Sequence, residues 1–171
     1  MPDPGTSQYR KVRTVIQLVV LAVVAVFLFP RIEWSGRKTT VGELATVKGL
    51  QSGLMFEARV DTGAALSSIH CLAIEIPDEA DDPRENLRKV ARVKIANASG
   101  DEAWIETKLI DYAAIRTSDA TKYRYHVRLR LRCADVEKET LVTLKDRSAM
   151  RYKLLLGRNF LADEFVVDVS N

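Results

Sequence analysis

The residues best suited to chemistry lie in one short stretch, residues 59–70, which reads RVDTGAALSSIH. Asp61, Thr62 and Gly63 directly follow an apolar run, and a carboxylate at the end of a hydrophobic strand costs stability unless something uses it. One interpretation is a strand that ends in a turn, because Asp, Thr and Gly are common turn residues. The other is a catalytic aspartate, Asp61, that takes a proton from a reacting group.

Two cysteines and two histidines are the other candidates for chemistry. Cys71 and Cys133 can pair in an oxidising compartment, but nothing in the sequence tells whether they lie close together. With His70 and His126 they make a four-ligand zinc set by composition, yet no C-x-x-C or H-x-x-x-H spacing supports one. The serines before His70 lack a nucleophile elbow, so a structural histidine is favoured there. The sequence therefore favours no metal and no cofactor.

The elements that position these residues are mainly strands, because apolar and alternating runs separated by turn residues follow residue 40. The predicted strands are 40–47, 54–60, 67–76, 90–96, 102–110, 123–132, 140–144, 152–156 and 165–169. The clearest is 123–132, YRYHVRLRLR, which places tyrosine and aliphatic side chains on one face and arginine and histidine on the other. Residues 157–163 are the best short helix, and the charged stretch 77–89 is a surface loop.

A β-hairpin is predicted where strands 90–96 and 102–110 flank residues 97–101, NASGD. Asn97, Ala98 and Ser99 also match a glycosylation sequon, but a hairpin turn accounts for these residue types without it. The hairpin is therefore the preferred interpretation of this stretch.

The N-terminal segment is predicted to cross a membrane. Residues 14–29, TVIQLVVLAVVAVFLF, carry no charge and rise about 24 Å as a helix, a little short of a bilayer core of about 30 Å. A snorkelling Arg13 extends the segment and Pro30 closes it. A cleaved signal peptide is the main alternative, but small residues at A-x-A spacing are missing where cleavage would fall. We expect a basic tail over 1–13, an anchor over 14–30 and a linker over 31–40.

The formal net charge of +3 belongs to this N-terminal part. Residues 1–38 hold six basic and two acidic side chains, whereas the rest of the chain holds 20 basic and 21 acidic ones. The charge therefore gives no support for nucleic-acid binding. Basic residues flank the anchor on both sides, but the short basic tail favours the tail inside and the domain outside. The prediction is a single-pass inner-membrane protein with a periplasmic domain.

Two motifs far apart in the chain resemble those of a known family. Residues 61–64, DTGA, and residues 154–159, LLLGRN, each end an apolar strand in the order found in the retroviral-type aspartic proteases. Within that group the chain is most similar to the bacterial retropepsin-like family often labelled ATP-dependent zinc protease. The match spans residues 41–169, through VGELATV, ARVDTGAALSSIHC, VTLKDRSAMRYKLLLGRNFL and FVVDVS. The resemblance implies a retropepsin-like closed barrel with one short C-terminal helix over residues 41–171.

The same resemblance implies an aspartic endopeptidase. Peptide hydrolysis by aspartates needs two carboxylates that face one water, one ionised and one protonated. The chain holds one D-T-G, and neither Asp146 nor Asp168 resembles a second catalytic loop. The resemblance therefore implies a homodimer in which each chain supplies Asp61 across a twofold axis, and tethering to a bilayer would raise the effective concentration of the partners. The implied partners are a second copy, a peptide or protein substrate and the bilayer.

The family pattern also implies roles around Asp61. The residue at Thr62 ties the two catalytic loops together, Gly63 lets the backbone approach closely, and Ala64 completes the loop. Gly157 closes a strand beneath that loop.

The resemblance makes Arg158 and Asn159 the matching helix-start residues. The viral enzymes pair this arginine with an acidic residue just after D-T-G-A, but Ala65 and Leu66 stand here. We therefore expect Arg158 to pair with Asp163 or Glu164. The family's zinc and ATP labels find no matching motif in the sequence.

A flap should cover the aspartates, and residues 112–126 are the candidate. The basic face of 124–132 either attracts an acidic peptide or is an ordinary solvated strand face, and the second interpretation is favoured. A non-catalytic peptide-binding module and a membrane-tethered scaffold remain alternatives to an enzyme. The intact D-T-G-A favours the enzyme, because a binding module has no need for an aspartate at that cost.

Overall fold

Strands dominate the computed structural model, which describes residues 38–116 and 121–170. The first strands are β1 (Thr39–Val41), β2 (Leu44–Gly49), β3 (Met55–Val60), β4 (Ser67–Glu75) and β5 (Val90–Ala96). The later elements are β6 (Glu102–Arg116), β7 (Thr121–Cys133), β8 (Val136–Lys145), β9 (Leu154–Leu156), α2 (Arg158–Leu161) and β10 (Phe165–Val167). The prediction of a mostly β domain with one short C-terminal helix is confirmed.

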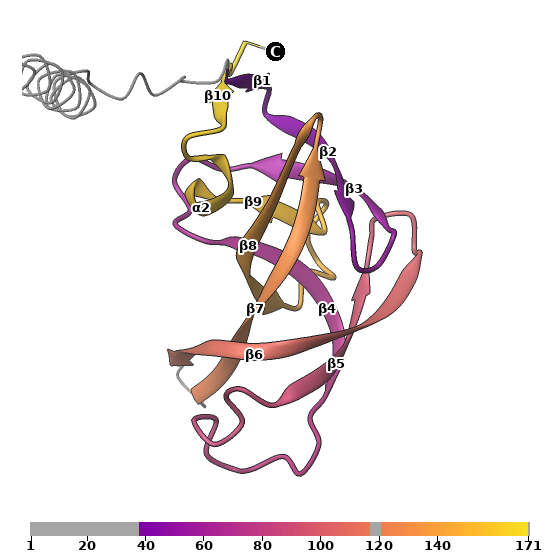
Figure 1. Cartoon of the computed structure of the whole chain (residues 1–171), viewed down its shortest axis with the longest axis vertical. Helices are drawn as coiled ribbons and strands as arrows, with labels where there is room; N and C mark the ends of the chain where they lie inside the picture. The colour runs from indigo at the N-terminus through magenta and orange to yellow at the C-terminus, as the bar shows by residue number, and fades with distance from the viewer. Residues whose placement is uncertain (1–37, 117–120, 171) are drawn as a thin grey trace, which may run out of the picture. The chain divides into compact units, whose positions relative to one another are not determined.

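The strands form one large sheet and one small sheet (Figure 1). The large sheet has the order β2-β3-β9-β4-β5-β6-β7-β8, and it returns on itself because β2 also pairs with β7 and β4 also pairs with β8. β1 and β10 form a separate parallel pair. β9 lies between β3 and β4 in the large sheet, so it joins the strands on either side of the DTGA loop.

The β6–β7 hairpin and β8 show the alternation expected from the sequence. Five side chains of β7 are buried on the inner face: Tyr125, Val127, Leu129, Leu131 and Cys133. On the outer face, Arg128 lies 3.7 Å from Glu139, and Arg132 pairs with Glu137, both acidic residues on β8. This part of the basic face therefore behaves as a solvated strand face with its own counter-charges.

Some boundaries differ from the predicted ones. The predicted strand 40–47 is two strands, because β1 pairs with β10 while β2 pairs with β3 and β7. The predicted strand 140–144 begins earlier, at Val136, because the polar residues before Thr140 pair across the sheet with β7. The helix is shorter than the predicted 157–163.

The predicted hairpin between β5 and β6 is confirmed. Asn97 closes its turn: the side-chain Oδ1 accepts hydrogen bonds from the backbone N–H of Ser99 and of Asp101, at 3.0 and 2.9 Å. Its Nδ2 donates to the Met55 carbonyl at 3.1 Å, and Asn97 is buried. The turn therefore accounts for this asparagine.

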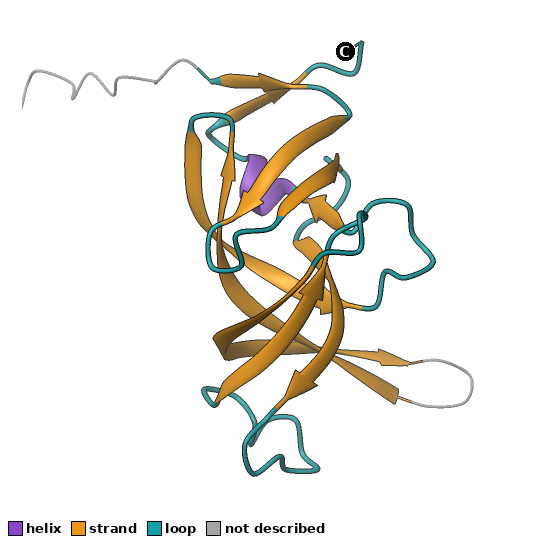
Figure 2. Ribbon diagram, turned by 90° about the vertical axis from the view of Figure 1, so that its right-hand side faces the viewer, coloured by secondary structure: helices purple, strands orange, loops and turns teal. Residues whose placement is uncertain are grey.

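The core is continuous beneath the helix. Phe160 and Leu161 of α2 are buried, and the ring of Phe160 stacks on that of Phe165 with centroids 5.3 Å apart. Leu154 and Leu156 of β9 are fully buried in the same cluster. Figure 2 shows α2 enclosed by strands, whereas the β6–β7 hairpin extends away from them. The helix is thus fixed to the core on one side and to the DTGA loop on the other.

The predicted tail over 1–13, the anchor over 14–30 and most of the linker lie outside the described residues. The described residues belong to one compact unit. Within the described ranges, no helix is long and apolar enough to cross a bilayer.

Candidate active site

The Asp61 carboxylate is fixed by its own loop. Its Oδ1 accepts hydrogen bonds from the backbone N–H groups of Gly63 and Ala64, at 2.9 and 3.1 Å. The backbone N–H of Asp61 donates to the Leu156 carbonyl at 2.9 Å, so the loop starts directly beside β9. A Cβ on Gly63 would lie 3.2 Å from Oδ1, so a larger residue here would require Oδ1 to shift by a few tenths of an ångström.

The DTGA loop and the second motif touch at Gly157. A Cβ at this position would meet the backbone of Leu66 and Ser67, with contacts of 2.6 Å to the Leu66 carbonyl carbon and 2.9 Å to the Ser67 nitrogen. Only glycine allows the two segments to pack this closely. The Gly157 N–H donates to Ser67 Oγ at 3.1 Å, and Ser67 is fully buried. Gly157 thus lies directly against the segment that follows the DTGA loop.

The start of α2 is capped by the DTGA loop itself. The first N–H groups of a helix have no partner within it. Here the N–H of Arg158 donates to the Ala64 carbonyl at 2.8 Å, and that of Asn159 donates to the Ala65 carbonyl at 3.2 Å. The helix start and the loop therefore hold each other in place.

The side chain of Arg158 also binds the loop. Its Nη1 donates to the carbonyls of Thr62 and Gly63, at 3.1 and 2.8 Å. The expectation that Arg158 pairs with Asp163 or Glu164 is wrong, because the guanidinium reaches carbonyl oxygens of the loop in place of a carboxylate. A backbone target leaves no signature in the residue types, so sequence reasoning missed it.

Asn159 joins three segments. Its Oδ1 accepts hydrogen bonds from the N–H and the Oγ of Ser67, at 2.9 and 3.0 Å. Its Nδ2 donates to Thr140 Oγ1 at 2.9 Å and to the Leu141 carbonyl at 2.7 Å, both on β8. Asn159 is therefore a structural tie among α2, β4 and β8, and Ser67 is part of the same network.

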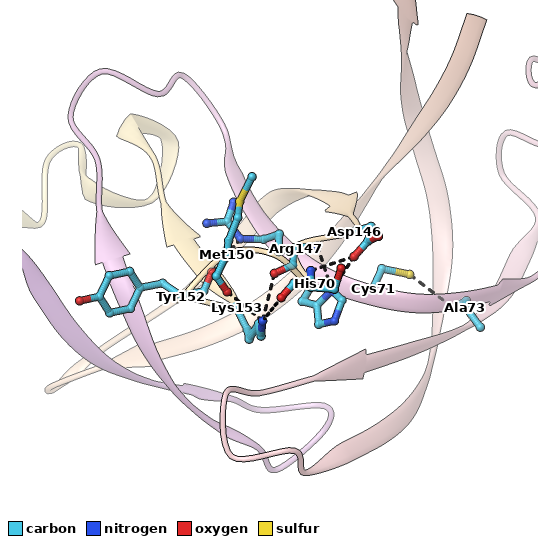
Figure 3. Close-up of polar contacts among 9 residues, drawn as sticks. His70, Cys71, Ala73, Asp146, Arg147, Met150, Tyr152 and Lys153 are labelled. Atoms are coloured by element: carbon cyan, nitrogen blue, oxygen red, sulfur yellow. Dashed lines mark hydrogen bonds and ion pairs between the residues drawn. The ribbon is translucent and has the colours of Figure 1, made fainter. Parts of the chain in front are cut away.

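Arg147 is a residue that the sequence interpretation did not single out. It is buried, and its Nη1 donates to Ser68 Oγ at 2.7 Å. Its Nε donates to the Tyr152 carbonyl at 3.0 Å (Figure 3). Burial lowers the pKa of the Arg147 guanidinium, and the nearby Asp61 carboxylate acts in the opposite direction. A buried cation thus lies within electrostatic range of the candidate catalytic aspartate. The only sequence signal for it is its place in the third segment of the family resemblance.

His70 holds the other side of this loop. Its Nδ1 accepts a hydrogen bond from the Arg147 N–H at 3.0 Å and lies 3.7 Å from Asp146 Oδ1. Lys153 Nζ donates to three carbonyls of the same loop, those of Arg147, Ser148 and Met150. Figure 3 shows these groups converging on the loop after β8. His70 is buried and hydrogen-bonded, as expected of a structural histidine.

The two cysteines are free thiols. Burial raises the pKa of the Cys71 thiol to about 11, which makes it a poor nucleophile at neutral pH. Among the residues that the structure describes, no three His, Cys, Asp or Glu side chains gather as metal ligands would.

The remaining predicted residues have these positions. The structure brings together the two motif segments, residues 61–64 and 157–159. The Thr62 side chain is exposed, and the partner that the family resemblance implies for it belongs to a second chain. The described residues of the flap candidate 112–126, namely 112–116 and 121–126, are the outer half of the β6–β7 pair, and residues 117–120 lie outside the described residues. Asp146 lies in the loop after β8, and Asp168 follows β10, where it accepts a hydrogen bond from the Ser170 N–H. Their structural surroundings do not form a second D-T-G loop.

The chain is similar in sequence to curated proteins that are much longer. It is 34% identical over 136 residues to a protein named "Probable alpha-L-glutamate ligase" from Parasynechococcus marenigrum, a match that covers 77% of this chain and 28% of that protein. A protein of the same name from Shewanella pealeana is 30% identical over 115 residues, covering 67% of this chain and 24% of that protein. The chain thus spans about a quarter of the length of the curated relatives it matches.

A solved structure shares the fold. The crystal structure of a protein of unknown function from Legionella pneumophila superposes with a TM-score of 0.64 at 21% identity, over 79% of this chain and 96% of that chain. At this identity the likeness concerns the fold alone.

A family profile matches almost all of the described part of the chain. Its description is RimB-like, "Retropepsin-like aspartic endopeptidase RimB", and the match covers residues 40–171. Both motifs of the site, the DTGA loop and LLLGRN, fall inside this range. The chain belongs to the RimB-like family of retropepsin-like aspartic endopeptidases.

Proposed function

We propose that the chain is an aspartic endopeptidase in which Asp61 activates water. The observation that carries the proposal is the fixed carboxylate: Oδ1 is held by two backbone N–H groups while the loop is held by α2 and Arg158. No described residue donates a hydrogen bond to Oδ2. A carboxylate oriented in this way presents one oxygen to a water, as general-base catalysis requires.

A second Asp61 from another copy would complete the site. Two carboxylates at one water share a proton, so one acts as a base while the other donates to the scissile carbonyl. The small β1–β10 sheet supports a dimer, because each of its strands has an outer edge without a further strand among the described elements. Val166 of β10 is half-exposed. The proposed assembly is a homodimer with a twofold axis beside the Asp61 loops.

The outer half of the β6–β7 hairpin is the proposed flap. It extends from the body of strands, and a hairpin of this kind can close over a bound peptide and exclude water. Closure would strengthen the electrostatic interactions of the aspartates with the scissile bond.

The printed names of the relatives suggest a substrate class. A segment similar to this chain is part of proteins named "Probable alpha-L-glutamate ligase". A peptidase hydrolyses the kind of bond that such a ligase forms, so peptides that carry α-linked glutamate are the first substrates to test.

The membrane location is likewise proposed from the sequence. A helix over residues 14–30 would anchor the chain in the inner membrane with the domain on the periplasmic side. Retention of the full-length protein in the membrane after alkaline carbonate extraction is the expected result. Protease accessibility of the domain in intact spheroplasts tests the orientation.

Substitution of Asp61 tests the activity. Full-length protein is incubated with a peptide library between pH 4 and 8, and the products are identified by mass spectrometry. Asp61→Asn keeps the shape of the side chain and should abolish cleavage, whereas Asp135→Asn, in the exposed turn between β7 and β8, should leave it unchanged. Cleavage that survives Asp61→Asn excludes the mechanism. Binding without cleavage by the unaltered chain would favour a peptide-binding module, and a function lost only on removal of residues 1–38 would favour a scaffold.

A further inference from the structure

A cavity of about 560 Å³ opens between β4, the outer ends of β6 and β7, and the end of β8. Its apolar wall includes Leu72, Ile115 and Tyr123. Leu72 and Tyr123 are 44% and 47% exposed, so apolar surface is open to solvent inside the cavity. Apolar walls with a few placed charges are typical of a ligand site.

The charged groups in the cavity wall are mainly cations. Lys122, Arg124 and Lys145 line it, together with one carboxylate, Asp146. Asp146 is engaged within its own loop, where Oδ1 accepts a hydrogen bond from the Ser148 N–H at 2.8 Å. The wall therefore carries an excess of positive charge.

These cations differ from the others on the same strand. Arg128 and Arg132 pair with acidic residues of β8. By contrast, no ion pair joins Lys122, Arg124 or Lys145 to a carboxylate of the described residues.

Two of the cations also repel each other. Strands β7 and β8 are antiparallel, with His126 opposite Thr143. The same register, continued by two residues, places Arg124 opposite Lys145. Burial first, and then the charges of Arg124 and Arg147, lower the pKa of Lys145. Like charges side by side on a sheet are destabilising, and an anion bound between them would remove the cost.

The cavity and the candidate active site share the loop after β8. Asp146, in the cavity wall, directly precedes Arg147, whose guanidinium donates to Ser68 Oγ at 2.7 Å. Burial lowers the pKa of Arg147, and the charge of Asp61 acts to raise it. A peptide that passes Asp61 in an extended conformation advances about 3.3 Å per residue, so a nearby side chain can enter the cavity.

From these contacts we infer that Lys122, Arg124 and Lys145 form a subsite for the side-chain carboxylate of an acidic peptide substrate. The apolar wall takes the aliphatic part of the side chain, and the cations bind its carboxylate by charge-assisted hydrogen bonds. Arg124 and Lys145 are specificity-determining residues of this subsite. The assignment of the bound peptide as a substrate rests on the proposed peptidase function.

Calorimetric titration of the full-length Asp61→Asn protein tests the subsite apart from cleavage. The probes are two N-acetylated, C-amidated octapeptides of alanine and glutamine, one of which carries a single Glu in place of Gln. A third peptide contains no Glu and has a free C-terminal carboxylate. The single Glu is placed at each of the eight positions in turn.

The Glu peptide should bind more tightly than the Gln peptide at one position or more. Arg124→Gln and Lys145→Gln should each reduce this preference roughly five- to tenfold, the effect of losing one charge-assisted hydrogen bond. Arg130→Gln is the matched control, since Arg130 lies on the same strand outside the cavity. Because Arg124→Gln relieves repulsion, it should not lower the thermal stability.

Three results would overturn the subsite. The first is equal affinity for the Glu and Gln peptides, and the second is an equal loss of the Glu preference in Arg130→Gln and Arg124→Gln. The third is tighter binding of the peptide with a free C-terminal carboxylate than of the Glu peptide, in a way that depends on Arg124. Acid-selective binding that depends on Arg124, without cleavage by the unaltered chain, would support the subsite and contradict the peptidase function. Cleavage without any preference for Glu would support the peptidase function and contradict the subsite.

Discussion

The residues around the Asp61 loop have two roles: some orient the Asp61 carboxylate, and others hold the loop in position. Gly63 and Ala64 orient Asp61 through backbone N–H groups. Arg158 binds the carbonyls of Thr62 and Gly63 from the outside, and its side chain is exposed. An exposed group that binds only a loop affects the position of that loop more than the stability of the fold.

Arg158→Gln should therefore lower peptide cleavage by roughly tenfold or more, because a small displacement of a catalytic group is costly. The free energy of unfolding should fall by about 1 kcal/mol or less. Arg92→Gln, which loses an exposed ion pair with Glu75, is the control and should change neither quantity by much. Cleavage rates and urea denaturation measure the two effects. A large loss of stability without a loss of cleavage would contradict the assigned role.

The Cys71 thiol gives a prediction about pH. Burial raises its pKa from 9.0 to about 11, so the folded chain holds the proton that the unfolded chain releases near pH 9. The unfolded state then binds fewer protons between pH 9 and 11, and the contribution of this thiol to stability is lost over that window as the pH rises.

At pH 8, alkylation of Cys71 in a Cys133→Ser background should be about 100-fold slower in the folded than in the unfolded protein, because the thiolate fraction differs by that factor. Timed labelling with iodoacetamide and mass spectrometry measure the two rates. Equal rates in the two states would contradict a buried, protonated thiol.

At the scale of elements, the site depends on the close approach of β9 and α2 to β4. Gly157 permits this contact, since a Cβ there would lie 2.6 Å from backbone of Leu66. Asn159 and Ser67 then connect the same elements through side-chain hydrogen bonds. The contact is with backbone atoms, which cannot rotate away.

Gly157→Ala should therefore destabilise the protein by about 1–3 kcal/mol and displace the DTGA loop. Gly100→Ala is the contrasting variant: it has open space within 4 Å but a φ of +89°, so it should cost about 1 kcal/mol through the backbone alone. Thermal denaturation of both variants gives the comparison. A Gly157→Ala protein as stable as the parent would show that the contact relaxes easily.

Most of the strands were predictable because burial on one face leaves an alternating pattern, as in β7. The start of β8 was not, because its Glu137 and Glu139 pair with arginines of β7 and leave no apolar run. The motif residues of the site were predicted through the family resemblance. The partners of Arg158 and the position of Arg147 were not, because backbone carbonyls and tertiary proximity leave no mark on residue types.

The whole molecule is proposed to act as a pair of chains held in a membrane. The chain carries one D-T-G loop, and the two-carboxylate mechanism needs a second one. The longer relatives contain a similar segment within about four times its length. The account therefore depends on whether two Asp61 side chains act together.

Mixing of active and inactive subunits tests this claim most directly. Full-length unaltered chains and Asp61→Asn chains are unfolded, combined in equal amounts and refolded together, and peptide cleavage is measured per total protein. If each active site needs Asp61 from both chains, only about a quarter of the randomly formed dimers are active, and cleavage should fall to about a quarter of the unmixed value. A fall to about one half would show that each chain acts alone and would contradict the shared site.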